Sequence, residues 1–172
     1  PHTPTTQSSS AASDVYKRQP VIHAHGKGRQ KTRDMKIDNS FRWQTNMIRS
    51  LEASYRSSPF FEYYEDDIRP VFEKKYDFLL DLNLASVEVI NACLGLDFSY
   101  GFTDSYQTES YPDDYRYLVN AKSKKEYDME PYTQVFGNKH GFLSNLSVLD
   151  LLFNEGTNAL NYLETHHSLI SK

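Results

Sequence analysis

The chain has 172 residues, of which 38% are hydrophobic and 24% are charged, and its net charge is -4 at pH 7. This composition is typical of one globular domain, and the acidic balance argues against nucleic acid as a partner. The single cysteine excludes an internal disulfide and fits a reducing, cytoplasmic location. No apolar run approaches the ~20 residues that a membrane span needs.

The first nineteen residues differ from the rest of the chain. They are rich in Ser, Thr, Ala and Pro, show no apolar periodicity, and resemble translated sequencing-adapter sequence. We therefore expect residues 1–19 to be a non-native, disordered tail. We expect residues 20–172 to form the domain, without its native N-terminal part.

The first half of this domain is predicted to contain two strands followed by three helices. Strand patterns cover Pro20–His23 and Gln30–Asp38, and apolar residues recur at helical spacing over 41–57, 60–74 and 78–94. Helix 78–94 is apolar on most faces, so we expect it to be the central helix. Gly95 is predicted to end this helix in a left-handed C-cap.

The second half alternates short elements with a long polar segment. Phe98, Tyr100 and Phe102 alternate as in a strand, and 104–131 is tyrosine-rich and loop-like, with a short helix near 113–119. The remaining predicted elements are a strand at 132–136, a helix capped by Ser144 or Asn145, and a last helix at 158–167. This order predicts an α/β or α+β single domain, in which several helices cover a small sheet.

The helix that follows the cap carries a single carboxylate, that of Asp150, among leucines. Ser147, Asp150 and Asn154 are spaced i, i+3, i+7 and so form one polar stripe. A carboxylate buried there must be hydrogen-bonded or paired. Asp150 is therefore either an anchor for the backbone of loop 137–145 or a catalytic acid. His140 is the candidate general acid or base beside it, because imidazole titrates near neutral pH.

Two groups of basic residues are candidate binding sites for a phosphate. Lys27, Arg29, Lys31 and Arg33 alternate along the predicted strand and would share one face, where arginine can bind phosphate bidentately. The alternative is a solvated edge strand that discourages sheet-to-sheet pairing. Asp114, Arg116 and Lys122 form the second group, in the tyrosine-rich loop. They could clamp an anion, and the alternative is a surface ion pair.

Sites for a metal or a cofactor are not predicted. His23 and His25 share one face but have no Cys, Asp or Glu ligand beside them, which is a weak metal signal. No P-loop, dinucleotide fingerprint or nucleophile elbow occurs in the sequence. We therefore expect neither a structural metal nor a cofactor, and the sequence leaves the oligomeric state open.

Four segments in this order, PVIHAHGKGRQKTRDMKIDNSFRWQ, YRSSPFFEYYEDD, YRYLVNAK and QVFGNKHGFLSNLSVLDLLFNEG, give the chain a resemblance to the WbqC-like family of bacteria. The resemblance covers essentially all of 20–172, and the last segment is its most specific part. Asp114, Arg116 and Lys122 fall on the family's Asp-x-Arg…Pro-Lys motif, with Ala121 in place of the proline. Gln134 and Asn145 match the last block, and with the motif residues they are expected to bind substrate.

The resemblance implies a role in the synthesis of surface polysaccharide or O-antigen. The expected activity is that of a transferase acting on a nucleotide-linked or lipid-linked sugar, with His140 and Asp150 handling a proton. The alternative is a non-catalytic module of the same pathway that binds a sugar nucleotide or a partner enzyme. The two alternatives differ in whether the basic residues and His140 converge on one cleft.

Overall fold

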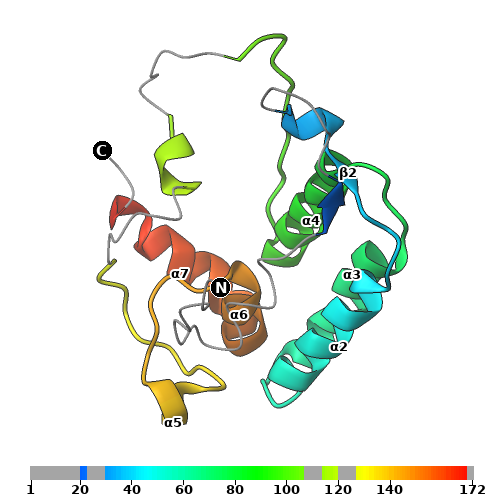
Figure 1. The fold of residues 1–172 in the computed structure, drawn as a ribbon. Helices are drawn as coiled ribbons and strands as arrows, with labels where there is room; N and C mark the ends of the chain where they lie inside the picture. Colours follow the sequence, from blue (N-terminus) through cyan, green and yellow to red (C-terminus); the bar gives the residue numbers. More distant parts are fainter. Residues whose placement is uncertain (1–19, 23–29, 107–113, 120–126, 170–172) are drawn as a thin grey trace, which may run out of the picture.

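The computed structural model describes residues 20–22, 30–106, 114–119 and 127–169 (Figure 1). The tail 1–19 lies outside the described residues. So do two of the predicted binding residues, Arg29 and Lys122, and the histidine pair His23 and His25.

The sheet is small and antiparallel. Strand β1 (Val21–Ile22) pairs with β2 (Lys36–Ile37), and Val21 lies opposite Ile37. The prediction of one continuous strand over Gln30–Asp38 was wrong, because a 3-10 helix, η1 (Thr32–Asp34), interrupts it. In this turn the backbone N–H of Asp34 donates to Lys31 and that of Met35 donates to Thr32, so the chain cannot stay extended.

Three helices follow, as predicted: α2 (Trp43–Tyr55), α3 (Phe61–Glu73) and α4 (Leu79–Leu94). Helix α4 ends in the predicted left-handed cap, with Gly95 at φ 72°. The backbone N–H groups of Gly95 and Leu96 donate to Ala92 and Asn91, which is the Schellman pattern.

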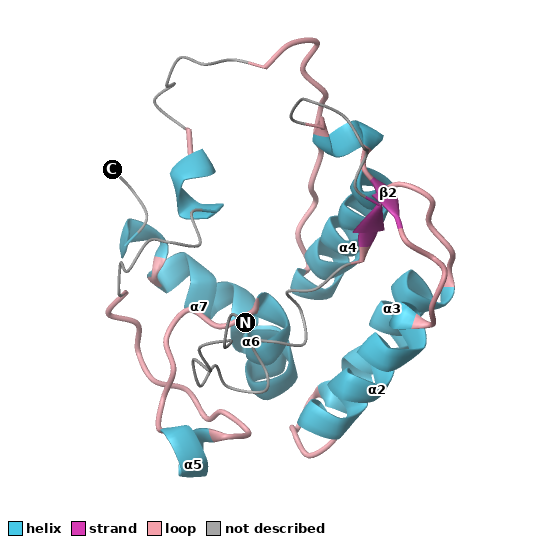
Figure 2. Cartoon of the chain, viewed as in Figure 1, coloured by secondary structure: helices cyan, strands magenta, loops and turns pink. Residues whose placement is uncertain are grey.

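Helix α3, rather than α4, is the central helix. It packs against α2, α4 and α6 (Val148–Glu155), and Figure 2 shows it between α2 and α4. In α4 only Leu82 is fully buried, although the helix is the most apolar of the three. The prediction that 78–94 is the central helix was therefore wrong, because apolar composition does not decide which faces find a partner.

The C-terminal half is helical and irregular. Its elements are η2 (Arg116–Val119), α5 (Gly137–His140), α6, η3 (Gly156–Asn158), α7 (Ala159–Thr165) and η4 (His167–Leu169). The short helix near 113–119 and the last helix are confirmed. The strands predicted over 98–102 and 132–136 are absent from the described chain, where both segments are coil. The cap of α6 is Ser147, whose side chain accepts from the N–H of Leu149, so the cap predicted at Ser144 or Asn145 was wrong.

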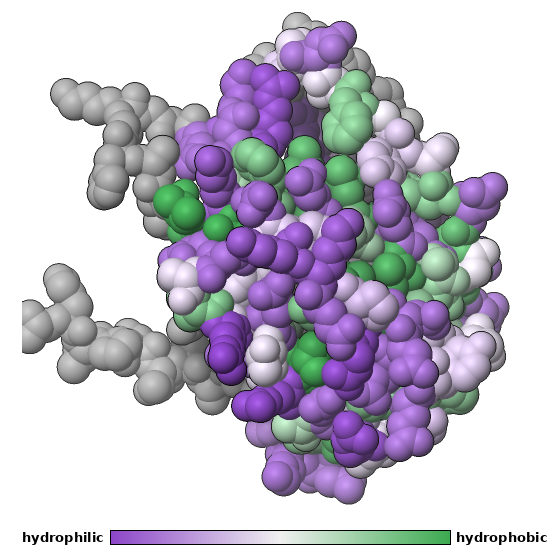
Figure 3. Space-filling view, turned by 90° about the vertical axis from the view of Figure 1, so that its right-hand side faces the viewer, coloured by the Kyte–Doolittle hydropathy of each residue, from purple (hydrophilic) through white to green (hydrophobic). Residues whose placement is uncertain are grey.

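Two hydrophobic clusters hold these elements together. The larger joins α2, α3, α6 and α7 around Tyr55, Phe61 and Phe153, and the smaller joins β2, α2, α3 and α4 around Ile37 and Trp43. Helices α2 and α3 are amphipathic, and Figure 3 shows that the face on their side of the molecule is mostly hydrophilic. The fold class is confirmed: helices pack with a small two-stranded sheet in an α+β arrangement.

Candidate functional site

Asp150 is almost completely buried in the first turn of α6, with 2% of its surface exposed. The hydroxyl of Tyr132 donates to its carboxylate at 2.7 Å. Burial raises the pKa of the Asp150 carboxyl, and hydrogen bonding from Tyr132 and then Tyr55 offsets part of that rise. Burial also raises the pKa of the Tyr132 hydroxyl, and Asp150 adds to the rise. Asp150 is therefore buried beside neutral tyrosines, with the Tyr132 hydroxyl as its hydrogen-bond donor.

Gln134, predicted to bind substrate, ties down the loop beside this network. Its side-chain Nε2 donates to the carbonyl of Leu143 at 2.8 Å, and its Oε1 accepts from the Leu143 N–H at 2.9 Å. One amide thus satisfies both backbone groups of a residue nine positions further along the chain. The anchor of loop 137–145 is Gln134, whereas the sequence had suggested Asp150 for that task.

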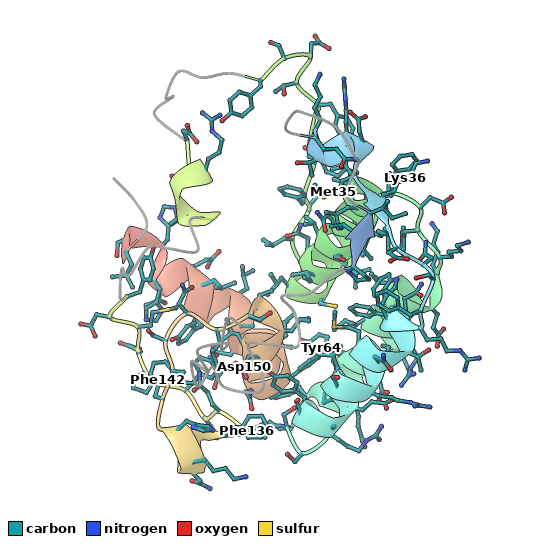
Figure 4. The ribbon with its side chains drawn as sticks, in the orientation of Figure 1. Met35, Lys36, Tyr64, Phe136, Phe142 and Asp150 are labelled. Carbon is teal, nitrogen blue, oxygen red and sulfur yellow. The ribbon has the colours of Figure 1, made fainter. Side chains whose placement is uncertain are left out.

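His140, the predicted general acid or base, ends α5 and is exposed. His140 and Asp150 line the same small cavity, together with Gln134 and Phe136. Asp150 points from α6 towards the segment that carries Phe136 and Phe142 (Figure 4). Among the described residues, however, the carboxylate of Asp150 is bonded to tyrosine and not to the imidazole of His140.

Asn145, the other residue expected to bind substrate from the last block, is exposed and has φ 56°. Asparagine adopts this left-handed conformation more readily than most residues. Asn145 lines a groove beside α7 rather than the cavity of His140 and Asp150. Gln134 and Asn145, the two candidate substrate-binding residues of the last block, therefore line different cavities.

The predicted row of cations is only partly described. Lys31 is the residue before η1 and Arg33 lies within it, so these two side chains do not share the face of an extended strand. Arg33 lies 3.9 Å from the carboxylate of Asp34, and both side chains are largely exposed. Binding of phosphate by Lys31 and Arg33 stays a prediction.

Arg116 and Asp114 form a tight pair, as their places in one motif suggested. The Nε of Arg116 donates to Asp114 at 2.8 Å, and Nη2 donates to the other carboxylate oxygen at 2.5 Å. The guanidinium carbon lies 5.2 Å from the centre of the Tyr106 ring. Asp114, with Tyr106 adding to its effect, raises the pKa of Arg116. Two partners thus fix a permanently charged, solvent-facing guanidinium.

Exposed aromatic side chains approach this arginine along the segment after α4. The aromatic row consists of Phe98, Tyr100, Phe102 and Tyr106, and between 42% and 78% of each residue is exposed. Ring centres are 6.1 Å apart for Phe98 and Tyr100 and 5.7 Å apart for Tyr100 and Phe102. The hydroxyl of Tyr100 donates to Glu88 on α4 at 3.0 Å. The alternation in the sequence was read as a strand, although it also signals a row of rings on one side of the chain.

The candidate residues therefore fall into separate groups. Helices η2, which carries Arg116, and α5, which carries His140, lie on opposite sides of α7, and η1 packs on α4 (Figure 1). Within the described parts of the chain there is no cluster of three or more metal-ligating residues. None of the described helices has the length and apolar character to cross a membrane.

Comparison with known proteins gives a family match. The WbqC-like protein family matches residues 19–123, which include the aromatic row and Asp114, Arg116 and Lys122. The match ends before the block 134–156, so the assignment of Gln134, His140 and Asp150 to the site remains a prediction from sequence. Neither the curated proteins nor the solved structures that were searched contain a match.

Proposed function

The chain belongs to the WbqC-like protein family, and from this premise we propose that it acts in bacterial surface-polysaccharide assembly as a module that binds a phosphorylated sugar. The sugar is nucleotide-linked or lipid-linked. The observation that carries the proposal is Arg116, held by Asp114 and stacked on Tyr106 at the end of the aromatic row.

The guanidinium is suited to a phosphate because its orientation is set before the ligand arrives. Asp114 engages Nε and Nη2 and so sets the plane of the guanidinium, and arginine pairs with phosphate through planar, directed hydrogen bonds. A fixed side chain loses less entropy on binding than a free one. The phosphate of the ligand therefore has a defined place beside the Tyr106 ring.

The aromatic row is suited to the sugar that follows the phosphate. Tyrosine and phenylalanine rings offer apolar faces, and the tyrosine hydroxyls offer hydrogen bonds at their edges. The bond from Tyr100 to Glu88 holds one ring in place. Exposed apolar surface of this extent on a folded protein usually marks a binding site.

Titration of the full chain with glucose 1-phosphate tests this proposal. We expect Arg116→Lys to weaken binding roughly tenfold, because lysine keeps the charge but loses the planar donors. The matched control is Arg56→Lys: Arg56 is also exposed, lies 3.8 Å from Glu52 and stands over the ring of Phe61. Equal affinities for the wild type and Arg116→Lys would contradict the proposal, and so would an equal loss in Arg56→Lys.

A second candidate function is the transferase expected from the sequence, and one observation favours it: His140 and Asp150 line one cavity. Its volume is about 10 Å³, which is room for a water molecule at most, so the sugar itself would bind outside it. In this reading His140 transfers the proton and Asp150 shapes the cavity wall. In cells that depend on this protein for surface glycan, we expect His140→Ala to abolish the glycan while the melting temperature of the purified protein is unchanged. Normal glycan in that strain would exclude the proton-transfer role.

A further inference from the structure

An apolar groove lies between α7, η4, η2 and the segment 127–129, and Leu118 in its lining is two residues from Arg116. Its volume is about 660 Å³, which is within the usual range for ligand pockets. Five leucines line it together with Met129 and Tyr127 from the connecting segment, and its polar residues are Asn145, Glu164, His166 and His167. Nothing in the proposed function so far uses this groove.

The lining is unusual because several of its leucines face solvent. Leu96 follows α4, Leu118 lies in η2 and Leu163 lies in α7, and between 36% and 40% of each is exposed. These residues come from distant parts of the sequence and converge on one groove. Convergence of exposed leucines from three elements is the pattern of a binding surface rather than of scattered surface residues.

The chemistry of the lining favours a hydrocarbon chain. Tyr127 is the one aromatic residue among the described residues of the lining, so the groove offers little for stacking a sugar or a base. Leucine and methionine side chains bind flexible apolar chains through buried area, and Met129 can adapt to their shape. Both ring nitrogens of His166 have partners within the protein. Its Nε2 accepts from the Glu130 N–H at 2.9 Å, and its Nδ1 lies 2.7 Å from the Tyr162 carbonyl.

The groove and the arginine site share their supporting segments. Arg116 and Leu118 belong to the same 3-10 helix, and Leu96 precedes Phe98 of the aromatic row by two residues. In Figure 1 helix η2 lies next to α7 and η4, whereas the segment 96–106 runs along α4. The segment comes close to η2 at Tyr106, whose ring lies under the Arg116 guanidinium. A phosphate at Arg116 would thus have the aromatic row on one side and the leucine groove on the other.

We propose that the ligand is a lipid-linked sugar phosphate, with its phosphate at Arg116, its sugar on the aromatic row and its hydrocarbon chain in the leucine groove. This inference rests on the proposed function and chooses between the two ligand classes that it allows. A nucleotide-linked sugar would leave the groove without an occupant. A hydrocarbon chain accounts for both the groove and its position beside the arginine.

The test is a titration of the full chain with farnesyl phosphate below its micellar concentration, with farnesol, UDP-glucose and glucose 1-phosphate as separate probes. We expect Leu163→Glu and Leu118→Glu each to weaken farnesyl phosphate binding at least roughly tenfold, because a charge replaces buried apolar contact. Both variants should bind glucose 1-phosphate as the wild type does. The control is Val87→Glu on α4, since Val87 is 40% exposed and lies outside the groove.

The outcomes separate this inference from the proposed function. Unchanged farnesyl phosphate affinity in both leucine variants, or an equal loss in Val87→Glu, overturns the lipid inference. Tighter binding of UDP-glucose than of farnesyl phosphate also overturns it. In each case an Arg116-dependent affinity for glucose 1-phosphate leaves the proposed function standing. Farnesol binding that matches farnesyl phosphate would show that the groove acts without the arginine, and this too overturns the inference.

Discussion

Asp150 and Asp114 are both carboxylates beside aromatic residues, but they differ in their burial and in the charge of their partners. Asp150 is buried, its partners are the neutral hydroxyls of Tyr132 and Tyr55, and burial raises its pKa. Asp114 is paired with the exposed, permanently charged Arg116 and raises the pKa of that guanidinium. Asp150 is therefore placed to hold the fold, whereas Asp114 orients a solvent-facing cation, as the proposed binding site requires.

The largest effect on stability is expected at Gly156, the residue that follows α6 and begins η3. Its φ is 59°, and an added Cβ would lie 2.7 Å from the ring of Phe60. We expect Gly156→Ala to reduce the free energy of unfolding by about 2–5 kcal/mol, from left-handed strain and overpacking together. Urea denaturation measures this change.

The control for Gly156 is Gly95, which has φ 72° but nothing within 4 Å of an added Cβ. Gly95→Ala should therefore cost about 1–2 kcal/mol, the strain alone. Equal losses in the two variants would show that the contact with Phe60 adds nothing to the cost. The packing around Gly156 would then be looser than we describe.

The next largest effect is expected from Asp150→Ala. The substitution leaves the hydroxyl of Tyr132 without its carboxylate acceptor in a partly buried place, at about 1–3 kcal/mol. We expect a loss of about 1–3 kcal/mol in unfolding experiments. Asp150→Asn keeps an acceptor and should lose less. A melting curve of Asp150→Ala that coincides with the wild type would remove the anchoring role.

A third prediction concerns pH. The folded-state pKa of Asp150 is raised above its ordinary value of 3.8, so the folded protein holds this proton more tightly than the unfolded chain does. The stabilisation that this tightly held proton gives the folded state is fully present below about pH 3.8. It is lost as the pH rises through the folded-state pKa, by about 1.4 kcal/mol for each unit that separates the two pKa values.

The measurement is urea denaturation of the wild type and of Asp150→Asn across this pH range. Relative to the variant, which does not titrate at this position, the wild type should become less stable as the pH rises. A constant difference between the two proteins, or a wild type that gains stability with rising pH, would contradict the raised pKa and the neutral environment of Asp150.

The sequence predicted most of the helices because their apolar residues recur at helical spacing. The polar stripe Ser147, Asp150 and Asn154 was also predicted correctly, and Asp150 and Asn154 are buried with bonded partners. Gly95 was predictable for a local reason, since only a left-handed residue closes the Schellman pattern. These features depend on neighbours within one or two helical turns.

The features that were not predicted depend on contacts that a single sequence does not specify. The alternation over Phe98 to Phe102 is the same in a strand and in an extended row of exposed rings, and only a paired strand distinguishes them. Gln134 was expected to bind substrate, but its partner is the backbone of Leu143, nine residues away. The leucine groove was not predicted, because Leu96, Leu118 and Leu163 come together only in three dimensions.

The smallest effect on stability, and the sharpest test of the comparison, is expected at Asp114. Asp114→Asn removes the charge that holds Arg116; the side chains of Arg116 and Asp114 are 45% and 15% exposed, and a pair that reaches the surface in this way contributes only about 0–1 kcal/mol to folding, so the melting temperature should change little. The affinity for glucose 1-phosphate should still fall several-fold, because Arg116 becomes free to move and must be ordered by the ligand. If Asp114→Asn instead lowered the melting temperature as Asp150→Ala does and left the affinity intact, Asp114 would be a second structural carboxylate. The arginine would then lack the support on which the binding proposal depends.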